Sequence, residues 1–363
     1  MIKAASPMCP PAKASLVDLT ERDVPELARF IAVQAGQSPE ERLAHLTWLL
    51  LENPARSAAG LPLGYGVRAG SALVGCILYL PQVFVFGGNP LLLLGSSCFY
   101  VDERHRGAGG ALFLKFSRAS AQWPLFANSA NAVAAALWKA RGATSIPDSD
   151  HEFLGIVDWT SIVEELAVRR GMGNALARAV GATTGWLRHF RKLRFPPSPE
   201  SRLRPLSSVD AVMDLQLAAE PEYVLTARRD EQYLRWRYFS GRDASTVLFV
   251  FRGPGDENPT LVAVNERRRG HRGQIKSLNV LDIYPKPDSS QLAAIVGALH
   301  EEYRDRTHMI VLRSVDPSCQ GVLRKAGFVR RDFDSPNGWL LDRGNLLPSR
   351  NFYFVPADGD WII

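Results

Sequence analysis

The feature that most constrains the fold of this chain is an apolar segment that runs directly into a glycine-rich turn and then into a helix. The segment from Leu91 to Val101 predicts a buried strand, and the pattern from Leu112 to about Ser120 predicts the helix. The turn between them contains the run Arg106-Gly107-Ala108-Gly109-Gly110-Ala111. Such a strand, turn and helix are typical of a phosphate-binding site, because backbone N–H groups converge there and the helix start carries a partial positive charge. Glycine is needed since a Cβ atom would hold a diphosphate away from the amides.

This turn matches neither of two common nucleotide-binding motifs. It lacks the GxxxxGK[ST] pattern of a P-loop, and its surroundings do not fit the GxGxxG pattern of a Rossmann site. Arg104, His105 and Arg106 add positive charge to the turn. The sequence therefore predicts an anion-binding turn of another kind.

The length of the chain and a proline-rich segment indicate two domains. The 363 residues suffice for two domains of roughly 150–200 residues each. Pro196-Pro197-Ser198-Pro199 ends any helix before it, so we place the domain boundary there. We expect an N-terminal domain at 14–185, a basic helix and linker at 186–199, a C-terminal domain at 200–345 and a tail at 346–363.

Most of the net charge of +6 comes from the basic segment Trp186 to Phe195, which has four cations and no acid. Trp186, Phe190 and Leu193 fall on one helical face. The segment is either a short interfacial helix in peripheral contact with an anionic membrane, or a linker helix that packs on a neighbouring domain. The nearly balanced charge elsewhere argues against a nucleic-acid-binding face, so we expect no DNA partner.

The two halves of the chain repeat one order of predicted elements. A strand, a helix and a closing glycine recur at 131–143 and 316–328. This order predicts a duplicated α/β domain.

The glycine-rich turn resembles the acyl-CoA loop of the GNAT (Gcn5-related N-acetyltransferase) superfamily, whose signature is [QR]-x-x-G-x-[GA]. Arg106 to Ala111 fits this signature. A second family block resembles the segment that begins at Asn131, where Trp138 replaces a tyrosine and Ala143 a phenylalanine. The resemblance implies an α/β (α+β) fold with two GNAT-like domains. Each domain would have a mixed, mostly antiparallel central sheet flanked by helices.

The resemblance also implies which residues bind acetyl-CoA or another acyl-CoA. Amides near Phe99, Tyr100 and Val101 would pair with the pantetheine arm, and amides of the turn would hold the pyrophosphate. Asn131 would lie alongside the cofactor, although a helix N-cap is a second interpretation of this residue. The turn residues are Arg106, Gly107, Ala108, Gly109, Gly110 and Ala111.

The second copy departs from this pattern. Its long strand leads into 284–288, where two prolines remove N–H donors and no glycine allows close approach. We therefore expect the acyl-CoA loop to be retained only in the N-terminal copy, and the second copy to shape the acceptor site.

The sequence gives weaker evidence for the catalytic residues than for the acyl-CoA-binding ones. The family's usual acid is Trp138 here, and the segment 91–100 contains no carboxylate. Tyr100 as acid and Glu103 as base remain the candidates. Asp150, Glu152 and Asp158, on an expected following loop, are further candidates, although a solvated or capping role is the favoured interpretation of each, because acids cluster at loop ends. Cys98 is interpreted as a small buried hydrophobe.

An arginine- and aromatic-rich run at 228–238 has two interpretations. Arg235, Trp236 and Arg237 could bind an anionic or sugar acceptor by ion pairing and stacking. Alternatively, an amphipathic helix buries Leu234 and Trp236 under a basic surface. The histidines show no metal-ligand spacing, so we expect no metal site.

We predict an acyl-CoA-dependent acyltransferase of the N-acetyltransferase type, which transfers groups other than aminoacyl groups. The acceptor is an amine or hydroxyl of a small molecule, a sugar or a lipid-linked sugar, and it attacks the thioester directly. The alternatives are a FemX-like aminoacyl-tRNA-dependent transferase, against which the balanced charge counts, and a non-catalytic acyl-CoA sensor or scaffold. The first 15 residues contain no apolar signal core, so we expect a cytoplasmic location.

Overall fold

The structure is a computed structural model, and it describes residues 14–183, 193–195, 202–215, 217, 222, 224–240, 245–253, 259–270, 273–313, 316–348 and 351–359. The chain divides into two compact units. The first comprises Met1–Gln82, Leu92–Phe126 and Leu341–Leu346, and the second comprises Val83–Leu91, Ala127–Leu340 and Leu347–Ile363. Most of the predicted basic segment and its proline-rich linker lie outside the described residues.

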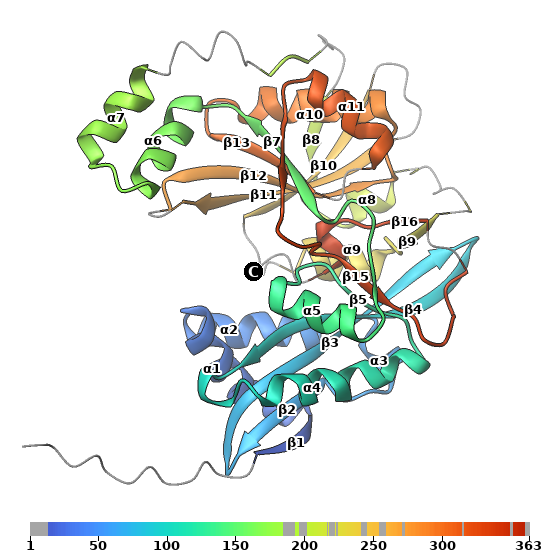
Figure 1. Cartoon of the computed structure of the whole chain (residues 1–363). Helices are drawn as coiled ribbons and strands as arrows, with labels where there is room; N and C mark the ends of the chain where they lie inside the picture. The colour runs from blue at the N-terminus through green and yellow to red at the C-terminus, as the bar shows by residue number, and fades with distance from the viewer. Residues whose placement is uncertain are drawn as a thin grey trace, which may run out of the picture. The chain divides into compact units, whose positions relative to one another are not determined.

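The first sheet has nine strands, and its path begins with the order β1-β2-β3-β4-β5 (Figure 1). β1 and β3 each pair with β2 in antiparallel fashion, and β4 pairs with β5 in parallel. These strands are β1 (Ala14–Leu19), β2 (Gly64–Ala69), β3 (Ala72–Phe86), β4 (Asn89–Val101) and β5 (Leu125–Ala127). The helical segments of this unit are η1 (Glu21–Asp23), α1 (Val24–Ala35), α2 (Pro39–Leu46), the π-helical turn η2 (Thr47–Leu51), α3 (Arg56–Ala59), η3 (Glu103–His105), α4 (Ala108–Ser117) and η4 (Arg118–Ala121).

Local sequence explains the ends of these helices. α1 buries Leu27 and Ile31 on one face and ends at Gly36, whose φ of 66° favours glycine. α2 begins after Ser38, whose side chain accepts a hydrogen bond from the backbone of Glu41. The strand β3 is continuous through Pro81, where the sequence predicts a break. The proline is tolerated because the β2 ladder ends at Leu78 and the next ladder on β3 starts at Phe84.

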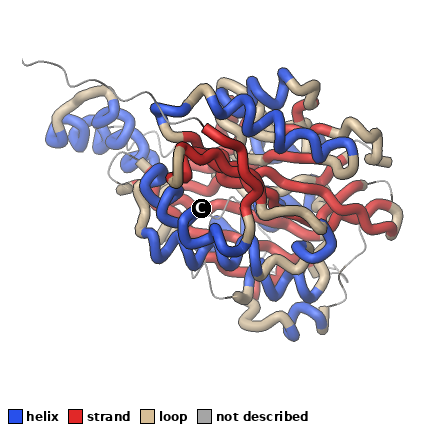
Figure 2. The backbone as a smooth tube through the Cα atoms, turned by 90° about the horizontal axis from the view of Figure 1, so that it is seen from below, coloured by secondary structure: helices blue, strands red, loops and turns tan. Residues whose placement is uncertain are grey.

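The second sheet has the order β14-β7-β13-β12-β11-β10-β8. Its pairs are antiparallel except β12–β13, which is parallel. Its strands are β7 (His151–Ile156), β8 (Arg202–Pro205), β10 (Thr246–Arg252), β11 (Thr260–Arg269), β12 (Ile275–Tyr284), β13 (Met309–Arg313) and β14 (Val329–Asp332). Both sheets therefore contain four neighbouring strands followed by one parallel strand. The predicted fold class, with mostly antiparallel mixed sheets flanked by helices, is confirmed (Figure 2).

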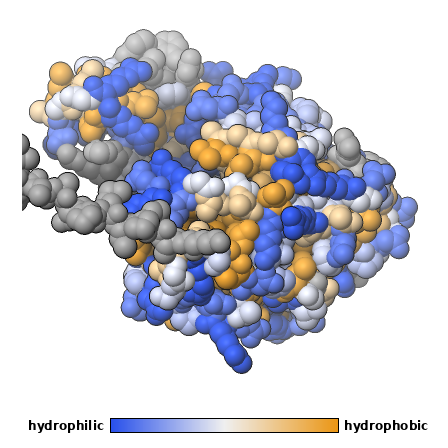
Figure 3. All heavy atoms as spheres, turned by 60° about the horizontal axis from the view of Figure 1, so that its bottom comes forward, coloured by the Kyte–Doolittle hydropathy of each residue, from blue (hydrophilic) through white to orange (hydrophobic). Residues whose placement is uncertain are grey.

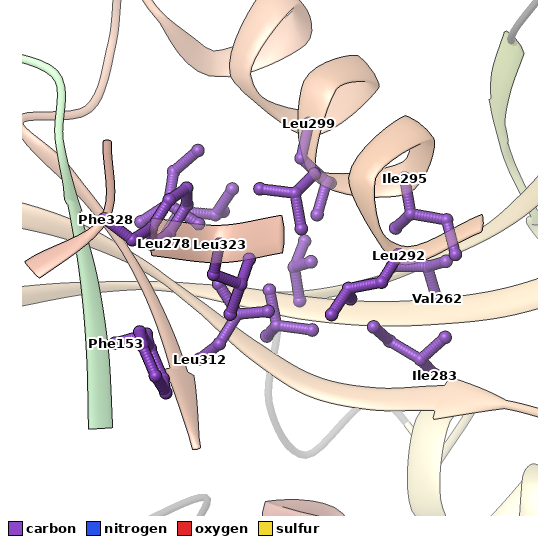
Figure 4. Packing of buried hydrophobic residues seen from close by; sticks show 14 of the residues in the cluster. Phe153, Val262, Leu278, Ile283, Leu292, Ile295, Leu299, Leu312, Leu323 and Phe328 are labelled. Carbon is purple, nitrogen blue, oxygen red and sulfur yellow. The ribbon is translucent and has the colours of Figure 1, made fainter. Parts of the chain in front are cut away.

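The helices α10 (Ser289–Tyr303) and α11 (Pro317–Lys325) cover one face of this sheet (Figure 1). Leu292, Ile295 and Leu299 of α10 and Leu323 of α11 meet the sheet in a continuous core (Figure 4). Burial of these side chains is the main stabilising contribution in this region. The other elements of the second unit are α5 (Ala132–Ala140), α6 (Trp159–Arg169), α7 (Asn174–Thr183), α8 (Asp210–Met213), α9 (Glu231–Tyr238), η6 (Pro356–Asp358) and the short strands β6 (Thr144–Ser145), β9 (Leu225–Ala227), β15 (Trp339–Leu341) and β16 (Phe352–Tyr353).

Strand β7 is the main departure from the predicted organisation. It lies between β13 and β14, so a strand from the middle of the chain completes a sheet built from the C-terminal half. Glu152, expected on a loop, is a buried residue of this strand. The basic positions 267–269 belong to the long strand β11. The predicted domain limits remain a prediction.

The described part of the predicted basic segment packs on protein. Leu193 and Phe195 are partly buried against the core formed by α10, α11 and the second sheet. The ring of Phe195 contacts those of His300 and Phe328. Among the described residues, no helix is both long and apolar enough to cross a membrane. On the face seen in Figure 3, hydrophilic residues surround patches of apolar ones.

Candidate functional site

Strands β4 and β5 lie side by side only briefly. β5 is in register with β4 at Leu94 and Gly95 and ends at Ala127. β4 continues for six more residues, to Val101. A parallel pair that separates in this way leaves room beside the longer strand for an extended ligand that pairs with its backbone.

The backbone of β4 is irregular in this extension. Cys98 has a φ of 51°, in the left-handed region that non-glycine residues seldom adopt. Residues held in such a conformation concentrate at ligand-binding sites. Cys98 is buried, and its carbonyl accepts a hydrogen bond from the thiol of Cys76 at 3.3 Å. Its position agrees with the interpretation of Cys98 as a small buried side chain.

The glycine-rich turn follows β4 directly. Asp102 accepts a hydrogen bond from the backbone N–H of Arg104 at 2.9 Å and caps the short helix η3. The next helix, α4, begins at Ala108 after Gly107, and no side chain among the described residues caps this end. The N–H of Gly109 donates to the carbonyl of Arg106 at 3.1 Å. The first turn of α4 carries the partial positive charge of the helix start.

The glycines of the turn have different surroundings. A Cβ atom at Gly109 would lie 3.6 Å from Val101 and 3.9 Å from Phe99, so Gly109 packs against the end of β4. A Cβ atom at Gly107 or Gly110 would have nothing within 4 Å. The structure therefore brings Phe99 and Val101 against the start of α4, and it leaves the other two glycines open to a ligand.

The predicted catalytic residues Tyr100 and Glu103 have different surroundings. Glu103 is on the surface and forms an ion pair with Arg106 at 2.9 Å, with side chains that are 81% and 74% exposed. Tyr100 is half-buried in β4. Trp138, in the position of the family's tyrosine, is buried. Tyr100 and Glu103 remain predictions.

Asn131 belongs to the second unit and has the role of a helix cap. Its side chain accepts a hydrogen bond from the backbone N–H of Ala134 at 2.9 Å. The capping interpretation is therefore confirmed, and the contact with acyl-CoA remains a prediction.

The second sheet repeats the separation of parallel strands. β12 and β13 are in register up to Asn279 and Val311 and then separate around a small cavity of about 40 Å³. Asp282, Lys286 and Arg313 are among its polar lining residues. The following helix, α10, is capped by Asp288, which accepts a hydrogen bond from the backbone of Gln291 at 2.8 Å. A carboxylate therefore occupies the position where the first copy has open glycines, and it disfavours an anion there.

A buried ionic cluster lies beside this cavity. Arg229 pairs with Asp282 at 2.8 Å and with Asp358 at 2.7 Å, and all three side chains are at most 4% exposed. Tyr238 donates a hydrogen bond to Asp282 at 2.7 Å. These residues come from segments far apart in the sequence, and the sequence analysis missed them.

The predicted acceptor residues of α9 point in different directions. Arg235 is on the surface and pairs with Glu231 at 2.8 Å. Trp236 and Arg237 are buried, and Arg237 donates a hydrogen bond to the carbonyl of Gly359 at 2.6 Å. Trp236 and Arg237 thus have structural surroundings, while their role in acceptor binding remains a prediction.

A second charged cluster surrounds Glu152, which is fully buried. Its carboxylate accepts a hydrogen bond from Arg313 at 2.8 Å, pairs with Arg331 and lies 3.8 Å from Arg269. Burial lowers the pKa of Arg313 to about 10, so this side chain is still cationic at neutral pH. Three guanidinium groups around one carboxylate give this region an excess of positive charge.

No protein-family model matches the sequence, and no curated protein matches it. Solved structures are similar to the chain. One is a conserved protein of unknown function from Enterococcus faecalis, described as a probable N-acyltransferase. It is 10% identical, with a TM-score of 0.56 over 91% of this chain and 73% of its own.

Two further structures resemble the chain to a similar degree. A GCN5-related N-acetyltransferase from Anabaena variabilis is 11% identical, with a TM-score of 0.53 over 90% of this chain and 72% of its own. The N-myristoyltransferase of Saccharomyces cerevisiae, with bound myristoyl-CoA and inhibitors, is 11% identical. Its TM-score is 0.54 over 97% of this chain and 87% of its own. At these identities the similarity establishes the fold alone.

Proposed function

This chain has the GNAT fold, and we propose that it is an acyl-CoA-dependent acyltransferase. The observation that supports this most strongly is the continuation of β4 past the end of β5 into the open start of α4. The backbone of residues 99–101 would pair with the pantetheine arm. The amides at Arg106 to Ala111 would receive the pyrophosphate, with Gly107 and Gly110 leaving space for it.

The reaction is transfer of an acetyl or similar group to an amine or hydroxyl. The nucleophile attacks the thioester carbonyl, a C–N or C–O bond forms, and the C–S bond breaks. One proton leaves the nucleophile and one is taken up by the thiolate, which gives free CoA. The named structural neighbours include N-acetyltransferases and an N-myristoyltransferase with bound myristoyl-CoA, which supports acyl-CoA as the donor in general terms.

The second unit is the proposed acceptor-binding part. Its cavity between β12 and β13 contains Lys286 and Arg313, and α10 begins with a capping carboxylate instead of an open turn. The two cations are paired with carboxylates, Lys286 with Asp316 at 2.6 Å and Arg313 with Glu152 at 2.8 Å. The proposed acceptor is a nucleotide-sugar, a lipid-linked sugar or a small metabolite. A cytoplasmic location and a peripheral membrane contact through 186–195 belong to the same proposal.

A non-catalytic acyl-CoA sensor is the second candidate. It is favoured by the burial of Trp138, whose indole supplies no acid, and by the exposed ion pair of Glu103, which is not a well-placed base. An acyltransferase turns over acyl-CoA and a sensor only binds it, so a turnover assay distinguishes the two functions.

The test is release of free CoA thiol from acetyl-CoA and longer acyl-CoAs, in the presence of a panel of amino and hydroxyl compounds. We expect turnover by the wild type and its loss in Gly110→Glu, because the new carboxylate would occupy the phosphate position. Gly173→Glu is the matched control, since Gly173 also has nothing within 4 Å of an added Cβ atom. Acyl-CoA binding without turnover would favour the sensor.

A further inference from the structure

Two helices of the second unit, α6 and α7, form a hairpin. α6 packs on the second sheet, where Trp159 and Ile162 contact a cluster that includes Met309. α7 lies beyond α6 and packs against it (Figure 1). Gly181 allows the close approach of the two helices, since a Cβ atom there would lie 3.0 Å from the carbonyl oxygen of Thr160. The side of α7 that is turned away from α6 therefore lies at the surface.

The turn end of this hairpin exposes three large apolar side chains. Leu166 of α6 is 50% exposed, Met172 of the connecting turn is 38% exposed and Leu176 of α7 is 58% exposed. The backbone N–H of Met172 donates to the carbonyl of Ala167 at 3.1 Å, which holds the turn against the end of α6. Single exposed apolar side chains are common on proteins, whereas three at one end of one hairpin indicate contact with an apolar partner.

The charged side chains at the same end are mainly arginines. Arg169 and Arg170 lie at the end of α6, and Arg178 follows in α7. Both acidic residues of the hairpin are in ion pairs: Glu165 is buried and pairs with Arg169 at 3.0 Å, and Glu164 lies 3.7 Å from Arg178. Arg170 is exposed, so the hairpin presents positive charge beside its apolar side chains.

The sequence that begins at this end of the hairpin continues the positive charge. Residues 166–199 contain seven arginines and lysines and no acidic residue, in a chain whose whole net charge is +6. Exposed apolar side chains beside clustered cations are typical of helices that lie in a membrane interface. A nucleic acid would pair with the arginines alone, since its phosphates gain nothing from exposed leucine and methionine side chains.

We propose that the turn end of the α6–α7 hairpin docks on an anionic phospholipid surface. Leu166, Met172 and Leu176 enter the boundary between headgroups and acyl chains, and the arginines pair with headgroup phosphates. The contact is reversible and sensitive to salt, because three side chains bury little area and the charges are exposed. This docking surface lies before the segment 186–195 in the chain, and its assignment does not depend on the binding of acyl-CoA.

Sedimentation of the full chain with phospholipid vesicles tests the proposal. Vesicles of phosphatidylcholine alone are compared with vesicles of an equimolar mixture of phosphatidylcholine and phosphatidylserine. We expect binding to the mixed vesicles, little binding to the neutral ones and release of the bound protein as salt is added. Met172→Gln/Leu176→Gln should bind the mixed vesicles about tenfold or more weakly, because two apolar side chains are no longer buried there.

The matched control replaces the same residue types elsewhere on the surface. Met213→Gln/Leu346→Gln removes side chains that are 52% and 43% exposed, and it should bind as the wild type does. All four positions are exposed, so we expect both double variants to fold, which circular dichroism checks. Arg170→Gln should weaken binding about fivefold, whereas Arg304→Gln, on exposed α10, should leave it unchanged.

The outcomes distinguish the phospholipid surface from other occupants of this end of the hairpin. No binding to mixed vesicles, equal binding to neutral and mixed vesicles, or undiminished binding by Met172→Gln/Leu176→Gln contradicts the proposal. A dimeric wild type that binds no vesicles and becomes monomeric in this variant identifies a second copy of the chain as the occupant. Binding of duplex DNA or RNA that Arg170→Gln weakens, without any binding of vesicles, identifies a nucleic acid. The acyltransferase proposal is tested separately, by acetyl-CoA binding and CoA release.

Discussion

At the scale of single residues, the buried charges of the second unit stand out. Glu152 is fully buried and forms ion pairs with three arginines. These are Arg313 of β13, Arg331 of β14 and Arg269 of β11. Arg313 is 14% exposed, whereas Arg331 is 51% exposed. A carboxylate in this position is required by its surroundings, because Arg313 would otherwise be a buried charge without compensation.

This arrangement predicts a large effect of Glu152→Gln. The substitution keeps the shape of the side chain and removes its charge, so we expect the free energy of unfolding to fall by about 3–5 kcal/mol. Arg331→Gln should cost about 1 kcal/mol or less, since that arginine is half exposed. Urea denaturation of both variants measures the difference. Equal stability of Glu152→Gln and the wild type would contradict this account of the cluster.

Asp358 gives the second residue-scale prediction. Burial raises its pKa to about 6, with the charge of Asp282 acting in the same direction and Arg229 opposing it. The folded chain therefore keeps a proton that the unfolded chain loses between about pH 4 and pH 6, so this group lowers stability as the pH rises through that interval.

We expect Asp358→Asn to gain stability relative to the wild type as the pH increases from about 4 to about 6, with no further gain above it. Thermal or urea unfolding at several pH values measures this difference. Asp305→Asn is the surface control, because that side chain is 94% exposed. A stability difference between Asp358→Asn and the wild type that stays constant over this range would refute the prediction.

At the scale of elements, the sequence identified those whose pattern is local. The sequence predicts the strand β4 and the helix α11, because the apolar pattern and the ends of each lie within a few residues. The strand β7 was missed because its neighbours, β13 and β14, lie more than 150 residues further along the chain. Its short length gave no periodic signal that could outweigh the acidic residues around it.

The same limit applies to the candidate site. The glycine-rich turn is contiguous, so its residues could be named from the sequence. The clusters of Arg229 and Glu152 bring together residues from three or more separate elements, which no spacing rule reports.

The place of β7 in the second sheet predicts the effect of Gly155→Ala. A Cβ atom at Gly155 would lie 2.5 Å from the ring of Phe328, which belongs to the hydrophobic core of the second sheet. We expect the free energy of unfolding to fall by about 1–3 kcal/mol, because the ring must shift in a packed interior. Gly173→Ala is the control, with nothing within 4 Å of the added atom, and should change stability by about 0.5 kcal/mol or less. Equal effects of the two substitutions would contradict the assigned packing of β7.

At the scale of the whole molecule, the two sheets share one order of five neighbouring strands. They differ in the turn that follows the fourth of these strands. In the first, the strand leads into open glycines and an uncapped helix; in the second, it leads into prolines and a helix capped by Asp288. One fold thus has a helix start without a side-chain cap in one copy and a capped one in the other. This difference is the basis for assigning acyl-CoA to the first copy and the acceptor to the second.

The measurement that tests this assignment most directly is calorimetric titration of acetyl-CoA into the full chain. The account predicts saturable binding at one site. Gly110→Glu should bind about tenfold or more weakly, because its carboxylate would lie at the uncapped start of α4, and Gly173→Glu should bind as the wild type does. Undiminished binding by Gly110→Glu, or no binding of acetyl-CoA and longer acyl-CoAs by the folded wild type, would contradict the central claim.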